Sequence, residues 1–362
     1  MYLYIGYYIL LLCNVFFAFH KTHSVLIFRL TFIFVWILYF GNTLNPDLLN
    51  YEVIYNSSSV TPDVGFRFIV QLSKYFGLDF KAFVFVISLI CLLLIFYSIG
   101  KFTKNKNFVM ALYMIYPFVF DIIQLRNFIA MAIVIFSIQF LLKRDMKNKR
   151  YYIIGICLAS SIHILMFVYI SFLFINLEYE KKNKNVKLLV MITTISCLFV
   201  FLNGNSLSFL SQITFLAPGK YLYYFTKKLG YGFLVNWFFS LLSFYMVYIS
   251  RKRIKQNWNT NASNKYRLKF VDLVFWINVL SLAFFPFYML NINFYRLYRN
   301  LSLLNYTVYA IANDSYVDSG NKGRRQYNIY IILSLSILFI YDVVLNYGLV
   351  FKPIFENNIF IK

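Results

Sequence analysis

The sequence is poor in the residues on which metal- and redox-dependent enzymes rely. It contains four Cys and three His among 362 residues. The cysteines all lie in apolar segments, and their spacing matches neither a metal knuckle nor a redox pair. We therefore expect small buried hydrophobes at these positions, and a protein that needs no metal and no cofactor. The four are Cys13, Cys91, Cys157 and Cys197.

Charged residues are also scarce, and acids are scarcer than bases. Charged side chains make up 13% of the chain, against about 25% in a typical soluble domain. With 13 acidic and 35 basic residues, the formal net charge is +22. In a soluble protein this excess would suggest a nucleic-acid partner, but 61% of the residues here are hydrophobic. The composition is typical of a membrane protein.

Ten apolar segments alternate with short loops. A spanning helix needs about 20 apolar residues, and most of these segments meet that length. We expect an all-α polytopic membrane protein with a single membrane domain, 1–362, about ten full transmembrane helices and one broken helical hairpin. The segments are 1–19, 24–40, 82–100, 108–121, 124–142, 188–204, 232–250, 268–290, 296–314 and 327–348.

Lys and Arg gather in alternate loops, which predicts the orientation. Loops rich in these residues stay in the cytoplasm, so both termini should lie outside. The basic charge then serves topology and contact with anionic lipid, and we expect no nucleic-acid partner. The basic loops are 20–23, 101–107, 143–150, 177–187, 251–267 and 315–326, and the two long outer loops are 41–81 and 205–231.

The apolar stretch 151–176 has basic residues on both flanks. A single span cannot place both flanks in the cytoplasm, but two half-helices that meet near Ser160, Ser161, Ile162 and His163 can. Broken helices are tolerated where they line a protein-buried or wet cavity. We expect a hairpin that enters from inside with His163 near its tip; one tilted span with a misplaced basic flank is the alternative.

The outer loops carry patterned aromatic residues. In 63–76, apolar residues recur every fourth position, which predicts an amphipathic helix that either lies in the membrane interface or caps the bundle. In 205–231, a Tyr-rich run follows Pro218. Such rings suit the headgroup zone, and sugars also stack on them.

Polar residues cluster at the expected outer ends of the spans. Asp47, Tyr51 and Tyr55 recur every four residues, so a helix would present them on one face. Two outer turns carry further polar residues. They are Asp121, Gln124, Arg126 and Asn127 in one turn, and Asn291, Asn293, Arg296, Arg299 and Asn300 in the other.

Three arginines at one membrane face suit a diphosphate ligand. Arg126, Arg296 and Arg299 have few acids beside them in sequence, and guanidinium binds phosphate oxygens through a bidentate fork. The alternative is that each arginine reaches lipid headgroups.

His163 is the only histidine in the interior of an apolar stretch. Its ordinary pKa lies near operating pH, so it is the natural general base, with Asp47 as second choice; a hydrogen-bonded core histidine is the alternative. We expect Asp272 and Asp342 to pair locally or to reach water, and Asn278 to make an interhelical hydrogen bond.

Four stretches resemble the EpsG-like family of Wzy-type polysaccharide polymerases. They are GNTLNPDLLNYEVIY, DVGFRF, QLRNFIAMAIVIFSIQFLLK and YYIIGICLASSIHILMF, and the resemblance extends over about residues 1–310. The family's elements correspond here to Asp47 with Tyr51, Asp63 with Gly65 and Phe66, Arg126 with Ala130, and His163. Two positions depart from the family pattern: Asn127 stands where Gln is usual, and no Arg shortly precedes Asp47.

The resemblance implies a metal-independent membrane glycosyltransferase of GT-C-like architecture in the bacterial cytoplasmic membrane. Such an enzyme transfers a glycan from polyprenyl diphosphate to a sugar hydroxyl of the next lipid-linked repeat, at the outer face. It implies catalytic roles for His163 and Asp47. It implies partners in the lipid-linked oligosaccharide, the bilayer and other polysaccharide-assembly membrane proteins. The substrate-binding residues would be Arg126, Arg296, Arg299, Asp63, Tyr51, Gln124 and Asn127.

Three other functions stay open. A flippase or transporter would also have many spans, but it predicts internal repeats and charges at mid-membrane. A membrane O-acyltransferase would use His163 but would leave the outer arginines unexplained. A glycan ligase uses the same chemistry as the polymerase.

Overall fold

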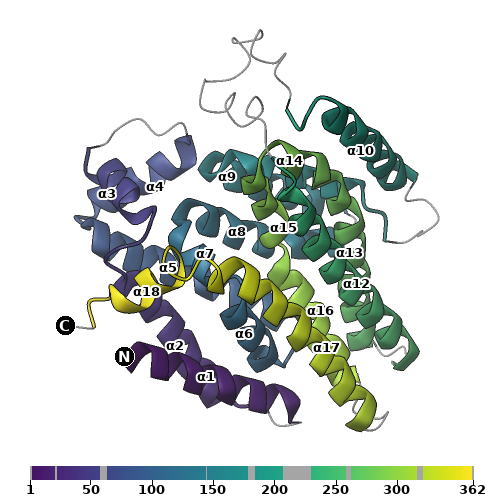
Figure 1. The fold of residues 1–362 in the computed structure, drawn as a ribbon, viewed down its shortest axis with the longest axis horizontal. Helices are drawn as coiled ribbons and strands as arrows, with labels where there is room; N and C mark the ends of the chain where they lie inside the picture. Colours follow the sequence, from purple (N-terminus) through teal and green to yellow (C-terminus); the bar gives the residue numbers. More distant parts are fainter. Residues whose placement is uncertain are drawn as a thin grey trace.

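A computed structural model shows an α-helical bundle with both chain termini near the same side (Figure 1). No β-strand occurs in the part of the chain that it describes. The described residues are 2–20, 23–57, 63–143, 145–177, 184–206, 230–257, 262–315 and 321–360. The Tyr-rich run after Pro218 and most of the loop 205–231 lie outside these ranges.

The chain is a multi-pass membrane protein. Six of the described helical segments are long and apolar enough to cross a membrane. Shorter apolar helices contribute to the bundle as well, and the ten full spans expected from sequence stay a prediction. The six segments are Tyr2–Phe19, Phe80–Gly100, Leu125–Leu142, Phe233–Asn257, Asn264–Leu290 and Lys322–Val344.

The helices at the start of the chain follow the apolar segments closely. They are α1 (Tyr2–Phe19), α2 (Val25–Gly41), α5 (Phe80–Gly100), α6 (Lys106–Ile115), α7 (Phe118–Ile123) and α8 (Leu125–Ile138). Two short outer helices, α3 (Leu48–Ser57) and α4 (Val64–Tyr75), lie between α2 and α5.

The second half is more interrupted. It comprises α9 (Met146–Ile162), η2 (Ile164–Phe174), α10 (Lys184–Leu202), α12 (Phe233–Asn257), α13 (Ala262–Ser281), α14 (Phe285–Leu290), η7 (Ile292–Tyr295), α15 (Arg296–Arg299), α16 (Ser302–Ser315), α17 (Asn321–Phe339), the π-helical turn η8 (Ile340–Val344) and α18 (Phe351–Glu356).

Two expected spans are divided. The segment 108–121 breaks at Pro117, which lacks the N–H that a continuing helix needs, so α6 and α7 are separate. The segment 296–314 consists of the single turn α15 followed by α16. These breaks lie close in sequence to the polar residues Gln124, Arg126, Arg296 and Arg299 that are described below.

The stretch 151–176 reverses direction. The Tyr152 hydroxyl donates a hydrogen bond to the backbone oxygen of Tyr169 at 2.7 Å. Seventeen residues of continuous α-helix would separate these residues by about 25 Å, so α9 and η2 must run back along each other. His163, with extended backbone, stands at the reversal. The break and reversal expected at His163 are confirmed, and entry of the hairpin from the cytoplasmic side stays a prediction.

The bundle has two distinct ends. One end carries basic loops, and we call it the basic end. Four helices finish there, α1, α5, α12 and α16, and five begin there, α2, α6, α9, α13 and α17. There Asn105 Nδ2 donates to Asp314 at 3.1 Å, and Asn313 Nδ2 donates to the Ala18 backbone oxygen at 3.0 Å. The opposite end, called the far end, holds α3, α4, α7, α14, α15 and α18 (Figure 1).

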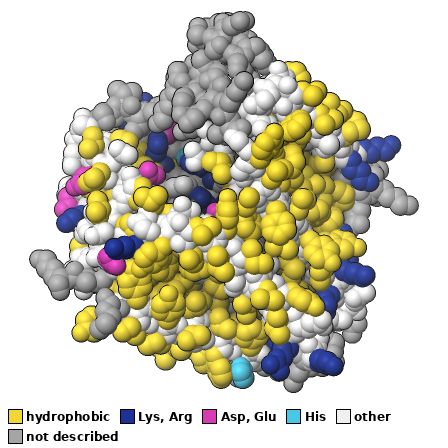
Figure 2. Space-filling view, in the orientation of Figure 1, with side chains coloured by type: hydrophobic (Ala, Val, Ile, Leu, Met, Phe, Trp, Pro, Cys, Tyr) yellow, Lys and Arg dark blue, Asp and Glu magenta, His cyan; other side chains and the backbone are white. Residues whose placement is uncertain are grey.

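Large hydrophobic side chains cover much of the bundle's surface. Figure 2 shows a broad apolar band, with Lys and Arg at its margins and around a hollow near the far end. Helix α4 adds to this surface: Phe66 and Val70 pack inward, whereas Phe68 and Leu72 are exposed. One face of α4 therefore packs on the bundle while its apolar stripe is exposed. Its place in the membrane interface stays a prediction.

Candidate active site

Three segments distant in sequence place polar side chains together at the far end. Arg126 comes from the first turn of α8, His163 from the hairpin tip and Arg296 from the start of α15. Arg296 Nη1 lies 3.4 Å from His163 Nε2, and both Arg296 and Arg126 act electrostatically on the imidazole. The structure thus brings together two of the three expected arginines and the expected base.

The contact between Arg296 and His163 defines the hydrogen-bonding state of the imidazole. Guanidinium can only donate hydrogen bonds, so Nε2 is the acceptor and the ring's proton is on Nδ1. Among the described residues, buried Nδ1 has no hydrogen-bond partner. A second bond, from Arg296 Nε to the Asn293 backbone oxygen at 2.9 Å, holds the arginine in place.

Arg126 is held by an acid and two rings. Its Nη1 donates to Asp63 Oδ2 at 2.5 Å, and its guanidinium carbon lies 5.8 Å from the Tyr51 ring centre and 5.9 Å from the Phe66 ring centre. The Arg126 side chain keeps 21% exposure. Its buried Nε lacks a described hydrogen-bond partner. This arginine is positioned by protein yet still open on one side.

A close helix contact sets the position of Asp63. A Cβ added at Gly65 would lie 2.1 Å from Ser161 Oγ and 2.8 Å from the Ser161 carbonyl carbon. Only glycine lets α4 approach the end of α9 this closely. The contact places Asp63, at the start of α4, beside the hairpin tip that carries His163. Gly65 belongs to one of the family motifs, but nothing in the sequence alone predicts this packing role.

Tyr51 in α3 adjoins Arg126, and Asp47, just before α3, lies within electrostatic reach of Tyr51. Tyr51 is buried, and burial raises the pKa of its hydroxyl. The nearby positive charge of Arg126 lowers this pKa in part, and the negative charge of Asp47 raises it further. Tyr51 therefore stays protonated and able to donate a hydrogen bond. Tyr55 is buried on the same face of α3 as Tyr51, as the four-residue spacing predicts. Its hydroxyl donates to the Leu78 backbone oxygen at 2.6 Å.

Arg299 occupies a different environment from the other two arginines. It is 6% exposed, and its guanidinium carbon lies 4.9 Å from the Phe120 ring centre. It donates to Gln124 Oε1 and lies within electrostatic reach of the buried carboxyl groups of Asp121 and Asp342. Arg299 is thus buried within electrostatic reach of two carboxyl groups, one of them on the π-helical turn η8.

Asn127 points into the bundle. Its amide group exchanges two hydrogen bonds with Asn300, at 2.8 and 3.1 Å, and both residues are buried. This pair joins α8 to the segment between α15 and α16, directly behind Arg126 and Arg299. The structure therefore gives Asn127 a supporting position rather than one on the open side of the site.

Asp272 and Asn278 behave as the sequence predicted, whereas Asp342 Oδ2 is buried without a hydrogen-bond partner among the described residues. Asp272 binds Arg251 at 2.6 Å and Lys255 at 3.0 Å, so local pairing is confirmed. Asn278 exchanges hydrogen bonds with Asn305 at 2.8 and 3.2 Å, which confirms an interhelical role. The sequence did not predict a chain of hydrogen bonds that links Tyr39, Tyr113 and Asp121. The Tyr39 hydroxyl oxygen lies 2.7 Å from the Tyr113 hydroxyl oxygen, and the Tyr113 hydroxyl donates to Asp121 Oδ2 at 3.1 Å.

One comparison with known proteins gives a match. The family model described as EpsG family matches residues 3–354, which is nearly the whole chain. No curated protein and no solved structure matches this chain. The match extends beyond the region in which the motifs were recognised and includes α17 and most of α18. This polysaccharide-related membrane protein belongs to the EpsG family.

Proposed function

We propose that the protein polymerises polysaccharide repeat units at the outer face of the bacterial cytoplasmic membrane. It would transfer a glycan from a polyprenyl diphosphate to a sugar hydroxyl of the next lipid-linked repeat. The observation that carries this proposal is the meeting of Arg126, Arg296 and His163 at one end of the bundle. Two cations beside a proton acceptor match a reaction in which a diphosphate leaves and a hydroxyl loses its proton.

The reaction assigns a task to each group. The acceptor oxygen attacks the anomeric carbon, the bond from that carbon to the diphosphate oxygen breaks, and the diphosphate departs with the electron pair. Arg126 and Arg296 hold the developing charge, because guanidinium stays protonated and binds phosphate oxygens through a planar fork. His163 Nε2 accepts the hydroxyl proton. Arg299, enclosed by carboxyl groups, supports the Gln124 turn.

Substrate binding and activation of the base are coupled in this scheme. Arg296 Nη1 donates to His163 Nε2 in the structure. A diphosphate competes for Arg296 and draws the guanidinium toward its oxygens, which frees Nε2 for the acceptor hydroxyl. The base therefore becomes available only when the donor is bound, which disfavours activation of water in its absence.

The decisive experiment is a reaction in detergent micelles with purified protein and lipid-diphosphate-linked repeats. A polymerase extends the repeats into a ladder of longer products on a gel and releases polyprenyl diphosphate. A transporter forms no new covalent product when there is no membrane to cross. Transfer only to an acceptor other than the repeat would assign a ligase instead, and acyl transfer would leave the diphosphate linkage intact.

A further inference from the structure

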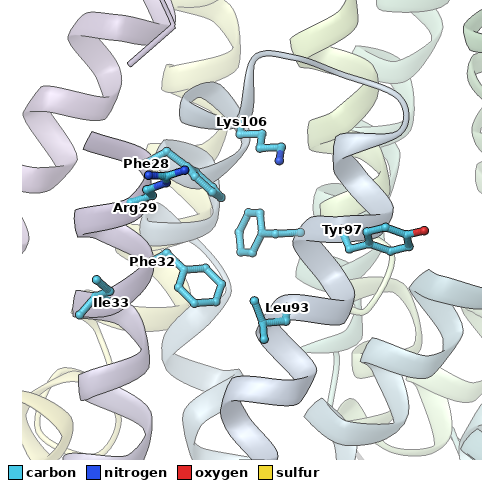
Figure 3. A pocket seen from close by; sticks show the side chains of 8 residues that line it. Phe28, Arg29, Phe32, Ile33, Leu93, Tyr97 and Lys106 are labelled. Atoms are coloured by element: carbon cyan, nitrogen blue, oxygen red, sulfur yellow. The ribbon is translucent and has the colours of Figure 1, made fainter. Parts of the chain in front are cut away.

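A second candidate site lies at the basic end, far from the polar cluster just described. A groove of about 430 Å³ runs between α2 and α5, beside the first turn of α6 (Figure 3). This volume falls within the range of about 300–1,000 Å³ typical of sites for small ligands. Its walls are mainly apolar, formed by Phe32, Ile33, Leu93 and Phe96.

The groove opens on the bilayer-facing surface of the bundle. Ile33 is 47% exposed and Leu93 is 53% exposed, whereas Phe96 closes the floor at 3%. A hydrocarbon chain of a lipid is the ligand that such a surface meets in a membrane. The apolar part of the groove therefore suits an acyl chain that leaves the bulk bilayer and lies between two helices.

Two cations stand at one end of the groove. Arg29 lies in the second turn of α2, and Lys106 is the first residue of α6. Lys106 Nζ lies 5.4 Å from the Phe28 ring centre, and none of the described lining residues is acidic. Within the described chain, neither side chain has a hydrogen bond or an ion pair. Their charge is left for a ligand.

The position of Lys106 depends on a missing side chain. A Cβ added at Gly100 would lie 2.9 Å from Lys106 Cε and 3.0 Å from its Nζ. The lysine stem therefore passes directly over Gly100, which keeps the ammonium next to the groove. Both helix starts are capped: Ser24 Oγ accepts from Ile27 N at 3.2 Å, and Asn105 Oδ1 accepts from Phe108 N at 3.1 Å.

We propose that this groove binds one anionic phospholipid of the cytoplasmic leaflet, with its phosphate between Arg29 and Lys106 and an acyl chain along Phe32 and Leu93. The basic loops place this end of the bundle at the cytoplasmic surface, where anionic lipids are found. Basic pockets between transmembrane helices on that side are suited to anionic head groups. The site is independent of the proposed glycosyl transfer and lies at the opposite membrane surface.

The test counts the lipids that stay on the intact protein in native mass spectrometry. The full chain is reconstituted with equal amounts of phosphatidylglycerol and phosphatidylcholine and then released from the bilayer. We expect one retained phosphatidylglycerol on the wild-type protein. The double variant Arg29→Gln/Lys106→Gln should retain it about 30-fold less, since each basic residue near an anionic surface contributes roughly a fivefold factor.

A matched control removes the same charge from the same end. Lys104 and Lys252 are exposed and lie outside the groove, so Lys104→Gln/Lys252→Gln should retain lipid as the wild type does. Equal loss in both double variants, or equal retention of the two lipids, would overturn the proposal. A groove-filling variant that keeps both charges, Leu93→Trp, should also lose the lipid; unchanged retention would place the acyl chain elsewhere.

One further outcome would reassign the groove. If polyprenyl phosphate displaces phosphatidylglycerol at equal concentration, the occupant is the carrier lipid and the phospholipid proposal is wrong. Activity in the micelle reaction distinguishes this site from the far-end site. We expect Arg29→Gln/Lys106→Gln to form polymer at the wild-type rate when no phospholipid is present.

Discussion

At the basic end of the bundle, some charges outside the groove pair with one another and join helix ends, whereas at the far end cations stand beside partners that a ligand can displace. Asp272 binds both Arg251 and Lys255, and Arg324 Nε donates to Asn313 at 2.8 Å. These contacts join helix ends. At the far end, Arg296 donates to the Asn293 backbone oxygen and lies 3.4 Å from His163 Nε2, two uncharged partners.

The far end also holds buried polar atoms that have no hydrogen-bond partner among the described residues. Unpartnered atoms of the described far end include Arg126 Nε, His163 Nδ1 and Arg299 Nε. Leaving such a group without a partner in a protein interior costs about 1–3 kcal/mol each, and more when it is charged. Proteins keep such costs mainly where function uses the group. The comparison therefore separates structural charges from functional ones, and the following variants test that separation.

The largest effect should come from the base. His163→Gln keeps a hydrogen-bonding side chain but removes useful basicity, so the rate should fall about 10²–10⁴-fold while donor lipid still binds. The micelle reaction measures the rate, and single repeats should accumulate in cells. If His163→Gln makes polymer normally while Asp47→Asn is inactive, Asp47 is the base and His163 has a structural role.

The second test compares two arginines in nearly identical ion pairs. Arg126 binds Asp63 at 2.5 Å at the far end, and Arg251 binds Asp272 at 2.6 Å at the basic end. Arg126→Lys should lower the rate about 100-fold, because an ammonium lacks the planar fork that grips two phosphate oxygens. Arg251→Lys should leave it unchanged. Equal rates at equal protein amounts in the two variants would show that Arg126 anchors headgroups or structure only.

The third test concerns the contact that positions Asp63. Gly65→Ala places a methyl group within 2.8 Å of the Ser161 backbone, so α4 must move away from α9. Overpacking of this kind typically costs about 1–3 kcal/mol. Thermal unfolding should reveal this loss, and the rate per folded molecule should fall about tenfold as Asp63 and Arg126 move.

A matched glycine separates packing from site geometry. A Cβ at Gly155 meets only the Ser137 side chain, at 2.0 Å from Oγ and 2.9 Å from Cβ. Gly155→Ala should therefore lower stability similarly, with partial rescue by Ser137→Gly, while the rate per folded molecule stays near normal. If the two glycine variants lose the same rate, the Gly65 contact has no special link to the site.

The sequence carried clear signals for several of these features. Basic flanks on both sides of 151–176 predicted the reversal at His163, because the rule for basic loops acts locally. The four-residue spacing of Asp47, Tyr51 and Tyr55 predicted their shared face. Pro117 in the middle of an apolar segment was a visible sign of the break between α6 and α7, but the span was not divided there.

Pairing across the bundle was beyond the sequence. Arg296 and His163 are 133 residues apart, and Arg126 and Asp63 are 63 apart. Charge spacing within one helix says nothing about which side chains the packing of other helices will bring near. The same reason applies to Arg299. Three arginines at outer turns look equivalent in the sequence, and only the fold shows that Arg299 is buried within electrostatic reach of Asp121 and Asp342. That Arg299 binds the diphosphate stays a prediction.

The smallest effect on catalysis should therefore come from Arg299. Arg299→Lys keeps a positive charge opposite Asp121 and Asp342 but loses the stacking on Phe120 and the geometry of the Gln124 contact. Stability should fall by about 1–3 kcal/mol, as expected for a weakened charged hydrogen bond and cation–π contact. The rate per folded molecule should change less than about threefold, since the side chain is enclosed rather than open to ligand. Thermal unfolding and the micelle reaction on the same preparation separate the two effects. A loss of rate as large as that of Arg126→Lys, with unchanged stability, would mean that all three arginines grip the diphosphate together and that the enclosed position opens when the donor binds.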